Sequence, residues 1–257
     1  MIFDAAHMFD FKDAGIEHPV YWNGDGPGVI MLHEINGMSP AFCRTANRIS
    51  EWGYKVYAPL IFGRPNEKVS VIRGGLTVMC VRREFDLWRG NGSSRITPWL
   101  RALCRRVDQE TGGRGVGVIG MCLTGNAVMS MMVEPCVKVP VMCEPALPFL
   151  NCYALGVPKH DLDTAADRSR ITPLLAYRFS EDKICPRERF VTLRTIFPVE
   201  GLKATEITSG TDSPFGIPKN AHSVLTGEYP HQEDPNHPVQ HVLDEILGQF
   251  SRHLARS

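Results

Sequence analysis

Short apolar runs alternate along this chain with segments of helical periodicity, and this alternation constrains the fold more than any other feature. The runs that predict buried strands are 28–33, 54–60, 116–119, 137–143, 173–179 and 202–208. Apolar residues at helical spacing and capping signals predict helices at 40–52, 94–110, 123–133, 187–197 and 239–255. Strands and helices that alternate over short links form sheets covered on both faces. We therefore predict an α/β fold with a mostly parallel central sheet and helices on both faces.

Composition narrows the class of protein further. The chain has 28 basic and 28 acidic residues and no net charge, which argues against a nucleic-acid partner bound through a basic surface. Its 257 residues suit a single domain spanning 1–257, and no internal repeat divides them. No apolar run reaches the roughly 18 residues of a membrane span, and the N-terminal stretch does not resemble a signal peptide. We expect a cytoplasmic protein without a membrane partner; the sequence carries no signal for its oligomeric state.

The eight cysteines do not form a metal or redox motif that the sequence can identify. No two are spaced as C-x-x-C, the main signal of zinc ribbons and thioredoxin-type sites. Several lie in apolar stretches, where a thiol acts as a small hydrophobic group. We expect reduced thiols that mostly serve packing, with no metal and no cofactor.

Residues 115–120 read GVGVIG and fit the glycine pattern of dinucleotide-binding proteins. In that pattern the glycines follow a strand and open a helix, whose first N–H groups bind the pyrophosphate. Here Gly115 and Gly117 precede or fall inside the predicted strand, and only Gly120 lies at its exit. We expect glycines at a strand entry rather than a nucleotide site.

The stretch after this strand, Gly120–Gly125, reads GMCLTG and predicts a nucleophile at Cys122. A reactive residue between small neighbours at a sharp strand-to-helix turn is the arrangement called the nucleophile elbow. The turn exposes the side chain above the sheet, and the helix start that follows is expected to favour a thiolate. The N–H of Leu123 would then bind an oxyanion. A buried packing role is the better interpretation of the other cysteines.

The partners of such a nucleophile follow in the order acid, then histidine. The strand 173–179 is followed by Glu181 and Asp182, either of which fits the acid. His222 fits the histidine, because it lies between the last strand and the C-terminal helix. The competing histidines are His231, His237 and His241, and a metal site formed by these three is a weaker interpretation.

Four stretches in this order make the chain resemble the dienelactone hydrolase family of α/β-hydrolases, from about residue 20 to the end. They are HEING at 33–37, GYKVYAPL at 53–60, GMCL at 120–123 and DKICP at 182–186. The resemblance implies an α/β-hydrolase fold and a Cys–His–Asp triad, which maps to Cys122, His222 and Asp182 and so selects Asp182 over Glu181. It implies that a small-molecule ester or lactone is cleaved through a thioester, as by a carboxymethylenebutenolidase.

The resemblance also assigns roles around the nucleophile. Glu34 matches a glutamate that contacts the resting thiol and helps to convert it to the thiolate when substrate enters. Ile35 would supply the second oxyanion N–H beside that of Leu123. Two features depart from the family pattern: Thr124 stands where a glycine is usual, and Thr226 stands where an arginine binds the carboxylate of a dienelactone.

The second arginine of that carboxylate site falls near Arg82 or Arg83, in the stretch VRREFDLWRG, which a solvated run of charges explains equally well. We therefore expect a less anionic ester or lactone than dienelactone itself. The alternative function is a non-catalytic or redox-sensing relative with a reactive Cys122. The simultaneous presence of Glu34, Asp182 and His222 favours the enzyme, because a sensor needs only the thiol and a positive neighbour.

Overall fold

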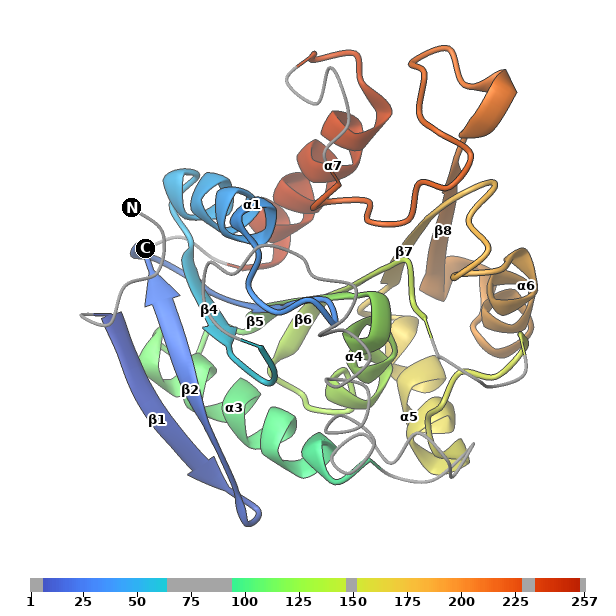
Figure 1. Ribbon diagram of the computed structural model, residues 1–257. Helices are drawn as coiled ribbons and strands as arrows, with labels where there is room; N and C mark the ends of the chain where they lie inside the picture. Colours follow the sequence, from blue (N-terminus) through green and yellow to red (C-terminus); the bar gives the residue numbers. More distant parts are fainter. Residues whose placement is uncertain (1–6, 64–93, 147–151, 228–233, 255–257) are drawn as a thin grey trace.

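The computed structural model of the protein describes residues 7–63, 94–146, 152–227 and 234–254. These residues form an eight-stranded sheet (Figure 1). Its strands are β1 (Met8–Asp13), β2 (Ile16–Asn23), β3 (Gly28–Leu32), β4 (Lys55–Pro59), β5 (Val116–Met121), β6 (Val137–Cys143), β7 (Leu174–Phe179) and β8 (Leu202–Ile207). The spatial order is β1-β2-β4-β3-β5-β6-β7-β8. Strands from β4 to β8 pair in parallel, whereas β1 and β2 are antiparallel to their neighbours, so the predicted mostly parallel sheet is confirmed.

Helices cover both faces of the sheet, as predicted (Figure 1). They are α1 (Pro40–Glu51), α3 (Ile96–Glu110), α4 (Ala127–Met131), α5 (Lys159–Ser169), α6 (Arg187–Ile196) and α7 (Pro238–His253), with 3-10 turns η2 (Cys122–Asn126), η3 (Val199–Gly201) and η4 (Gly210–Asp212). Side chains of β3 alternate between two apolar clusters. Val29 and Met31 join the cluster that includes α1 and α7, whereas Ile30 and Leu32 join the one that includes α3 to α6. Burial on both faces explains why the parallel strands read as continuous apolar runs.

The ends of α1 follow from identifiable residues. Ser39 caps its start, since its hydroxyl accepts the N–H of Phe42 at 3.2 Å, and Pro40 occupies the first turn. Gly53 follows its end with φ +91, a left-handed conformation that glycine adopts without strain. The capping and turn chemistry of the sequence is therefore sufficient to place this helix.

Three elements differ from the prediction. The antiparallel hairpin of β1 and β2 is not among the predicted strands, because its alternating polar residues lie at the sheet edge and few are buried. Helix α5 is also new: it is strongly polar and buries only Asp161, Ala165 and Ser169. The helix predicted at 123–133 begins as the 3-10 turn η2 and continues as α4.

The glycine motif at 115–120 lies at the entry of β5 and along it, as expected. Gly115, at φ +96, precedes β5, and Gly117 lies inside it. A Cβ atom on Gly117 would lie 2.5 Å from the Phe250 ring of α7. This glycine therefore lets the C-terminal helix approach the centre of the sheet. Among the described residues, no helix has both the length and the apolar character needed to cross a lipid bilayer.

We predict that Gly117→Ala lowers the free energy of unfolding by about 1–3 kcal/mol, because the added methyl overpacks the contact with Phe250. Urea denaturation measures this change. Adding Phe250→Leu should make the two effects less than additive, because the residues touch. Gly248→Ala, on α7 like Phe250, is the control. A Cβ at Gly248 meets nothing closer than 3.8 Å, so this variant should be at least as stable as wild type. Additive losses from Gly117→Ala and Phe250→Leu would contradict the contact.

Candidate active site

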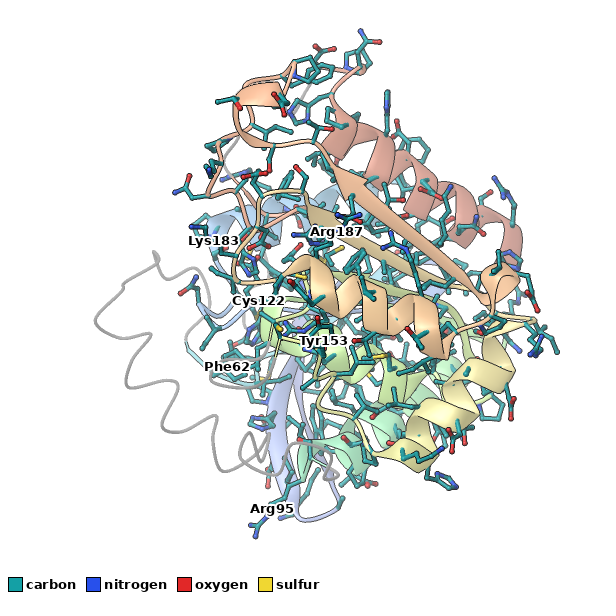
Figure 2. All side chains as sticks on the ribbon, turned by 90° about the vertical axis from the view of Figure 1, so that its right-hand side faces the viewer. Phe62, Arg95, Cys122, Tyr153, Lys183 and Arg187 are labelled. Carbon is teal, nitrogen blue, oxygen red and sulfur yellow. The ribbon has the colours of Figure 1, made fainter. Side chains whose placement is uncertain are left out.

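The carboxyl ends of the parallel strands bring the predicted side chains to one edge of the sheet. Cys122 directly follows β5, Glu34 follows β3 and Asp182 follows β7, while His222 comes from the loop between β8 and α7. The register places the ends of β3, β5 and β6 side by side. Figure 2 shows Cys122 near the middle of the molecule in that view. In open α/β sheets this edge is where ligands bind.

The strand-to-helix turn predicted at Cys122 is present. Cys122 has φ +53, a left-handed conformation that costs a non-glycine residue about 1–3 kcal/mol and that is common at functional sites. The turn is tight enough to require glycine before it, since a Cβ on Gly120 would lie 2.6 Å from both the Thr124 carbonyl and the Val128 side chain. The residue as a whole is partly exposed, although its thiol is largely removed from water.

Thr124, the residue that departs from the family glycine, connects this turn to β3. Its buried hydroxyl accepts the N–H of Met121 at 3.1 Å. The same hydroxyl lies 2.9 Å from the Met121 carbonyl, 3.2 Å from that of His33 and 3.3 Å from that of Leu32, all acceptors for its proton. The substitution therefore adds polar contacts between the nucleophile turn and the strand that precedes Glu34.

His222 and Asp182 form the contact expected of an acid and a histidine. Nδ1 of His222 lies 2.7 Å from Oδ2 of Asp182. The other carboxylate oxygen of Asp182 accepts the N–H groups of Ile184 and Cys185 at 2.8 and 3.2 Å, which fixes its orientation. Asp182 is buried and the His222 side chain is 15 % exposed, so this pair is largely removed from water.

Burial and charge act in opposite directions on the pKa values of His222 and Cys122. Burial lowers the His222 pKa, but the hydrogen bond to Asp182 and the interaction with Cys122 outweigh it and raise the pKa to about 11. For Cys122, loss of hydration raises the thiol pKa, His222 opposes the rise, and Glu34 and Glu144 add to it. The net pKa of Cys122 is raised, so loss of hydration and the two glutamates outweigh His222 at this thiol.

His222 and Cys122 thus interact, but Nε2 of His222 is buried without a hydrogen-bond partner of good geometry among the described residues. Close approach without a well-formed hydrogen bond is common in catalytic sites that hold no substrate. The ring nitrogen that faces away from Asp182 is therefore available to a reacting group.

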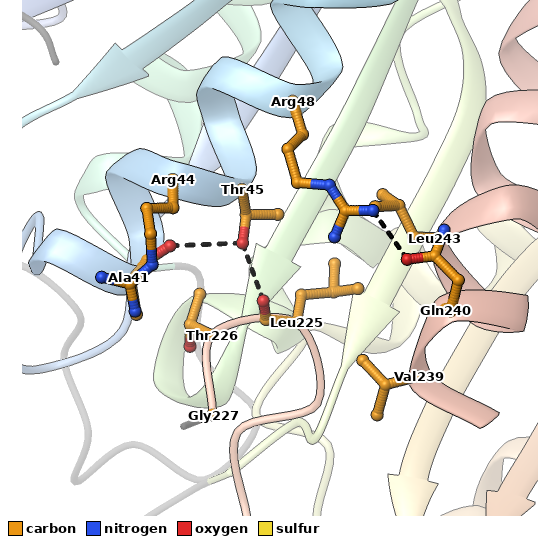
Figure 3. A pocket seen from close by; sticks show the side chains of 10 residues that line it. All are labelled: Ala41, Arg44, Thr45, Arg48, Leu225, Thr226, Gly227, Val239, Gln240 and Leu243. Carbon is orange, nitrogen blue, oxygen red and sulfur yellow. Dashed lines mark hydrogen bonds between the residues drawn. The ribbon is translucent and has the colours of Figure 1, made fainter. Parts of the chain in front are cut away.

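The loop that carries His222 is held from two sides. The backbone N–H of Val224 donates to Oε2 of Glu144 at 2.9 Å. From the other side, the hydroxyl of Thr45 on α1 donates to the Leu225 carbonyl at 2.7 Å (Figure 3). A cavity of about 100 Å³ lies between α1, this loop and α7. The position of His222 therefore depends on contacts made two and three residues after it.

The side chain of Glu34 is held by Thr226. The hydroxyl of Thr226 donates to Oε1 of Glu34 at 2.9 Å. The backbone is fixed by His33, whose Nδ1 lies 2.7 Å from the Glu34 carbonyl and whose Nε2 accepts the Ile61 N–H at 3.1 Å. Burial lowers the His33 pKa to about 4, although the bond to Glu34 opposes this, so His33 is neutral and structural.

Glu144 is a buried group of the site that the sequence interpretation does not include. It follows β6 directly, is fully buried and has φ +35, the same rare backbone region as Cys122. Burial raises its pKa well above the usual range, and Glu34 raises it further, against the effect of His222. The sequence signal that could have identified Glu144 is its position: it is a carboxylate directly after a buried strand, at the sheet edge that carries Cys122.

The remaining predicted residues divide into two groups. Ile35 and Leu123 lie on the segments that follow β3 and β5, and Leu123 belongs to the first turn of η2, where N–H groups have no partner within the helix. Arg82 and Arg83 lie outside the described residues.

The competing histidines have separate places. His237 is buried and caps α7, since its Nδ1 accepts the N–H of Val239 at 3.3 Å, and His241 is exposed on that helix. His231 lies outside the described residues. Within the described part of the chain, no group of three or more His, Cys, Asp or Glu side chains could hold a metal ion.

Comparisons with known proteins agree with this architecture. The model of the "Dienelactone hydrolase family" matches residues 16–200. A solved structure of a proposed dienelactone hydrolase from Klebsiella pneumoniae is 18 % identical, with a TM-score of 0.65 over 95 % of this chain and 97 % of that one. A dienelactone hydrolase-like promiscuous phosphotriesterase from metagenomic libraries is 17 % identical, with a TM-score of 0.64 over 96 % and 98 %. A third structure, Est1E from Butyrivibrio proteoclasticus, is 12 % identical, with a TM-score of 0.57 over 97 % and 100 %. No curated protein sequence matches the chain.

We predict that Thr124→Val lowers the free energy of unfolding by about 1–3 kcal/mol, because it leaves the buried Met121 N–H without its acceptor. Thr124→Ser keeps the hydroxyl and should recover most of the loss. Thr195→Val, on the exposed side of α6, removes only a contact with that helix's own backbone and serves as the control. Thermal and urea unfolding measure all three, and a Thr124→Val protein as stable as wild type would contradict this role.

Proposed function

Because the chain belongs to the dienelactone hydrolase family, we propose that it hydrolyses a carboxylic ester or lactone through Cys122, His222 and Asp182. The observation that carries the proposal is the 2.7 Å contact between His222 and Asp182 at the sheet edge where Cys122 occupies a strained, partly exposed turn. Nucleophile, base and orienting acid are the parts that acyl transfer requires. All three come from segments of the same sheet, which supports a single catalytic domain spanning 1–257.

The reaction proceeds in two stages. The thiolate of Cys122 attacks the carbonyl carbon, an S–C bond forms, and the carbonyl electrons move to oxygen. When this intermediate collapses, the ester C–O bond breaks, the alcohol takes a proton from His222, and a thioester remains. His222 then removes a proton from water, which attacks the thioester. The C–S bond breaks, the carboxylic acid leaves, and the Cys122 thiolate takes back the proton that the thiol lost at the start. In a lactone the leaving alcohol stays attached to the acyl group.

The raised pKa values of His222 and Cys122 indicate which group accepts the thiol proton. Asp182 keeps a proton on His222, so the imidazolium is placed as the acid for the leaving group. The thiol proton then needs another base, and the Glu34 carboxylate is near enough to Cys122 to raise its pKa. We assign this proton to Glu34, in line with the role that the family resemblance implies. Thr226 orients the Glu34 carboxylate for this transfer.

The oxyanion of the intermediate is assigned to the N–H groups of Leu123 and Ile35. Leu123 is the second residue of the 3-10 turn η2, directly after Cys122, and Ile35 follows Glu34 on the adjacent strand exit. Two backbone donors aimed at the developing charge are the usual source of stabilisation in acyl transfer, each contributing about 10²–10³ in rate. Gly37 donates to the Glu34 carbonyl at 2.9 Å, and this turn fixes the backbone of Ile35.

A redox-sensing role for Cys122 is the weaker candidate. A sensor thiol needs a low pKa and ready access, because the thiolate is the species that reacts with oxidants. Burial, Glu34 and Glu144 all raise the Cys122 pKa. A thiol that is neutral at rest and activated beside a base suits an enzyme better than a sensor.

The charge of the site supports an uncharged substrate. Glu34 acts on Cys122, the charge of Asp182 is paired with that of the His222 imidazolium, and Thr226 stands where the family resemblance places the cation that would bind a substrate carboxylate. A neutral carboxylic ester or lactone avoids repulsion by the Glu34 carboxylate. One structural relative is described as a promiscuous phosphotriesterase, and a phosphotriester is a neutral ester of another acid. A phosphotriester therefore belongs in the substrate screen.

We predict that Cys122→Ala lowers kcat/KM for a small activated ester by at least about 10³-fold while far-UV circular dichroism stays unchanged. Mass spectrometry of the quenched wild-type reaction should detect an acyl adduct on Cys122. Cys136→Ala, which removes a partly exposed thiol away from this edge, is the control and should keep full activity. Wild-type turnover by the Cys122→Ala protein would exclude the mechanism.

We further predict that dimethyl succinate is hydrolysed at least about 10-fold more efficiently than monomethyl succinate at neutral pH, because one unfavourable charge contact of about 1.4 kcal/mol gives this ratio. Thr226→Arg should narrow the ratio by supplying a cation. Thr226→Gln lengthens the side chain without adding charge, so it should leave the ratio of the two kcat/KM values unchanged. Equal kcat/KM for the two esters with the wild-type enzyme would show that the site does not discriminate by charge.

A further inference from the structure

A second glutamate lies among the groups of the site and has no role in the mechanism above. Glu144 follows β6 directly and no part of it is exposed to solvent. The charged and titratable groups that act on its carboxyl come from several segments: Glu34 after β3, Cys122 after β5, Asp182 and Cys185 after β7, and His222 from the loop before α7. Cys143, the preceding residue, also acts on it.

The backbone around Glu144 connects the nucleophile turn to the sheet. The N–H of Glu144 donates to the Tyr177 carbonyl of β7 at 2.7 Å. Two residues later, the N–H of Ala146 donates to the Cys122 carbonyl at 2.9 Å. The left-handed conformation of Glu144 therefore occurs in a segment bonded to a strand on one side and to the nucleophile on the other.

The side chain of Glu144 extends this connection to the histidine loop. Its Oε2 accepts the Val224 N–H at 2.9 Å, two residues after His222. Its Oε1 is buried and has no hydrogen-bond partner among the described residues. A buried carboxylate with one donor, on which the charge of Glu34 also acts, is strongly disfavoured as an anion. A carboxylic acid, by contrast, keeps the bond to Val224 and removes the repulsion.

We propose that Glu144 is a positioning residue that retains its proton: it holds the His222 loop against the nucleophile turn through the Val224 N–H and adds no negative charge beside Glu34. The direction of its pKa agrees with this state, since burial and Glu34 both raise it. The proposal deepens the hydrolase function and rests on it for the kinetic test alone. The spectroscopic and stability tests need no substrate.

The protonated state is tested by infrared spectroscopy of wild type and Glu144→Gln, which replaces the acid by a neutral group of the same shape. At neutral pH the difference spectrum should contain one C=O band of a protonated carboxylic acid, shifted in D₂O. The Glu181→Gln control changes an exposed carboxylate and should show only the bands of an ionised group. A Glu144→Gln difference spectrum with carboxylate bands alone would overturn the proposal.

Unfolding provides an independent measurement of the same proton. A carboxyl whose pKa is higher in the folded state binds a proton that the unfolded chain releases, so stability falls as pH rises above the unfolded pKa of about 4.3. Wild type should therefore lose stability relative to Glu144→Gln as the pH is raised from about 4 to 7. A stability difference between the two proteins that does not change with pH would contradict the proposal.

The positioning role is tested by kinetics with a neutral ester. Glu144→Gln keeps an acceptor for Val224 and should retain kcat/KM within about 3-fold, whereas Glu144→Ala should lose about 10–10²-fold because the histidine loop shifts. If Glu144→Ala does not fold, Glu144→Gln still decides, since a large loss in that variant would overturn the role. If wild type hydrolyses no ester, the proposed function fails, while the infrared and unfolding results still decide the state of Glu144.

Discussion

The register of the parallel strands is the constraint on which the rest of the structure depends. Apolar side chains of β3 and its neighbours pack against helices on both faces, so a slip by one residue would exchange the two faces of a strand. This packing aligns the strand ends and brings together the segments that carry Glu34, Cys122, Glu144 and Asp182. The chemistry of the edge thus depends on hydrophobic contacts made well below it.

The carboxyl groups at this edge of the sheet are largely removed from water, so the donors that the protein supplies determine how each one is stabilised. Each carboxyl has a different set of partners: Asp182 has two backbone N–H groups and His222, Glu34 has the Thr226 hydroxyl, and Glu144 has one backbone N–H. Glu144, whose only donor is a backbone N–H, retains its proton in our proposal. This difference in hydrogen-bond donors lets three acidic side chains share a site with one thiol and one imidazole.

Local sequence patterns predicted the elements that bury continuous apolar surface. They did not predict the hairpin of β1 and β2 or helix α5, whose polar residues resemble loops until the sheet edge and the neighbouring helices are present. The raised pKa of Cys122 is also set by tertiary structure. The helix start after Cys122 is visible in the sequence, but the loss of hydration that raises the thiol pKa comes from packing by distant segments.

The sequence by itself determined the layered α/β architecture and the tight turn at Cys122, because apolar periodicity, glycines and caps act over a few residues. Only the tertiary structure decided the contact between His222 and Asp182, which are 40 positions apart, and that between Thr226 and Glu34, which are 192 apart. It also decided the burial of Glu144. Such contacts depend on which loops the packed sheet brings together and how much water it removes, and no local pattern encodes either quantity.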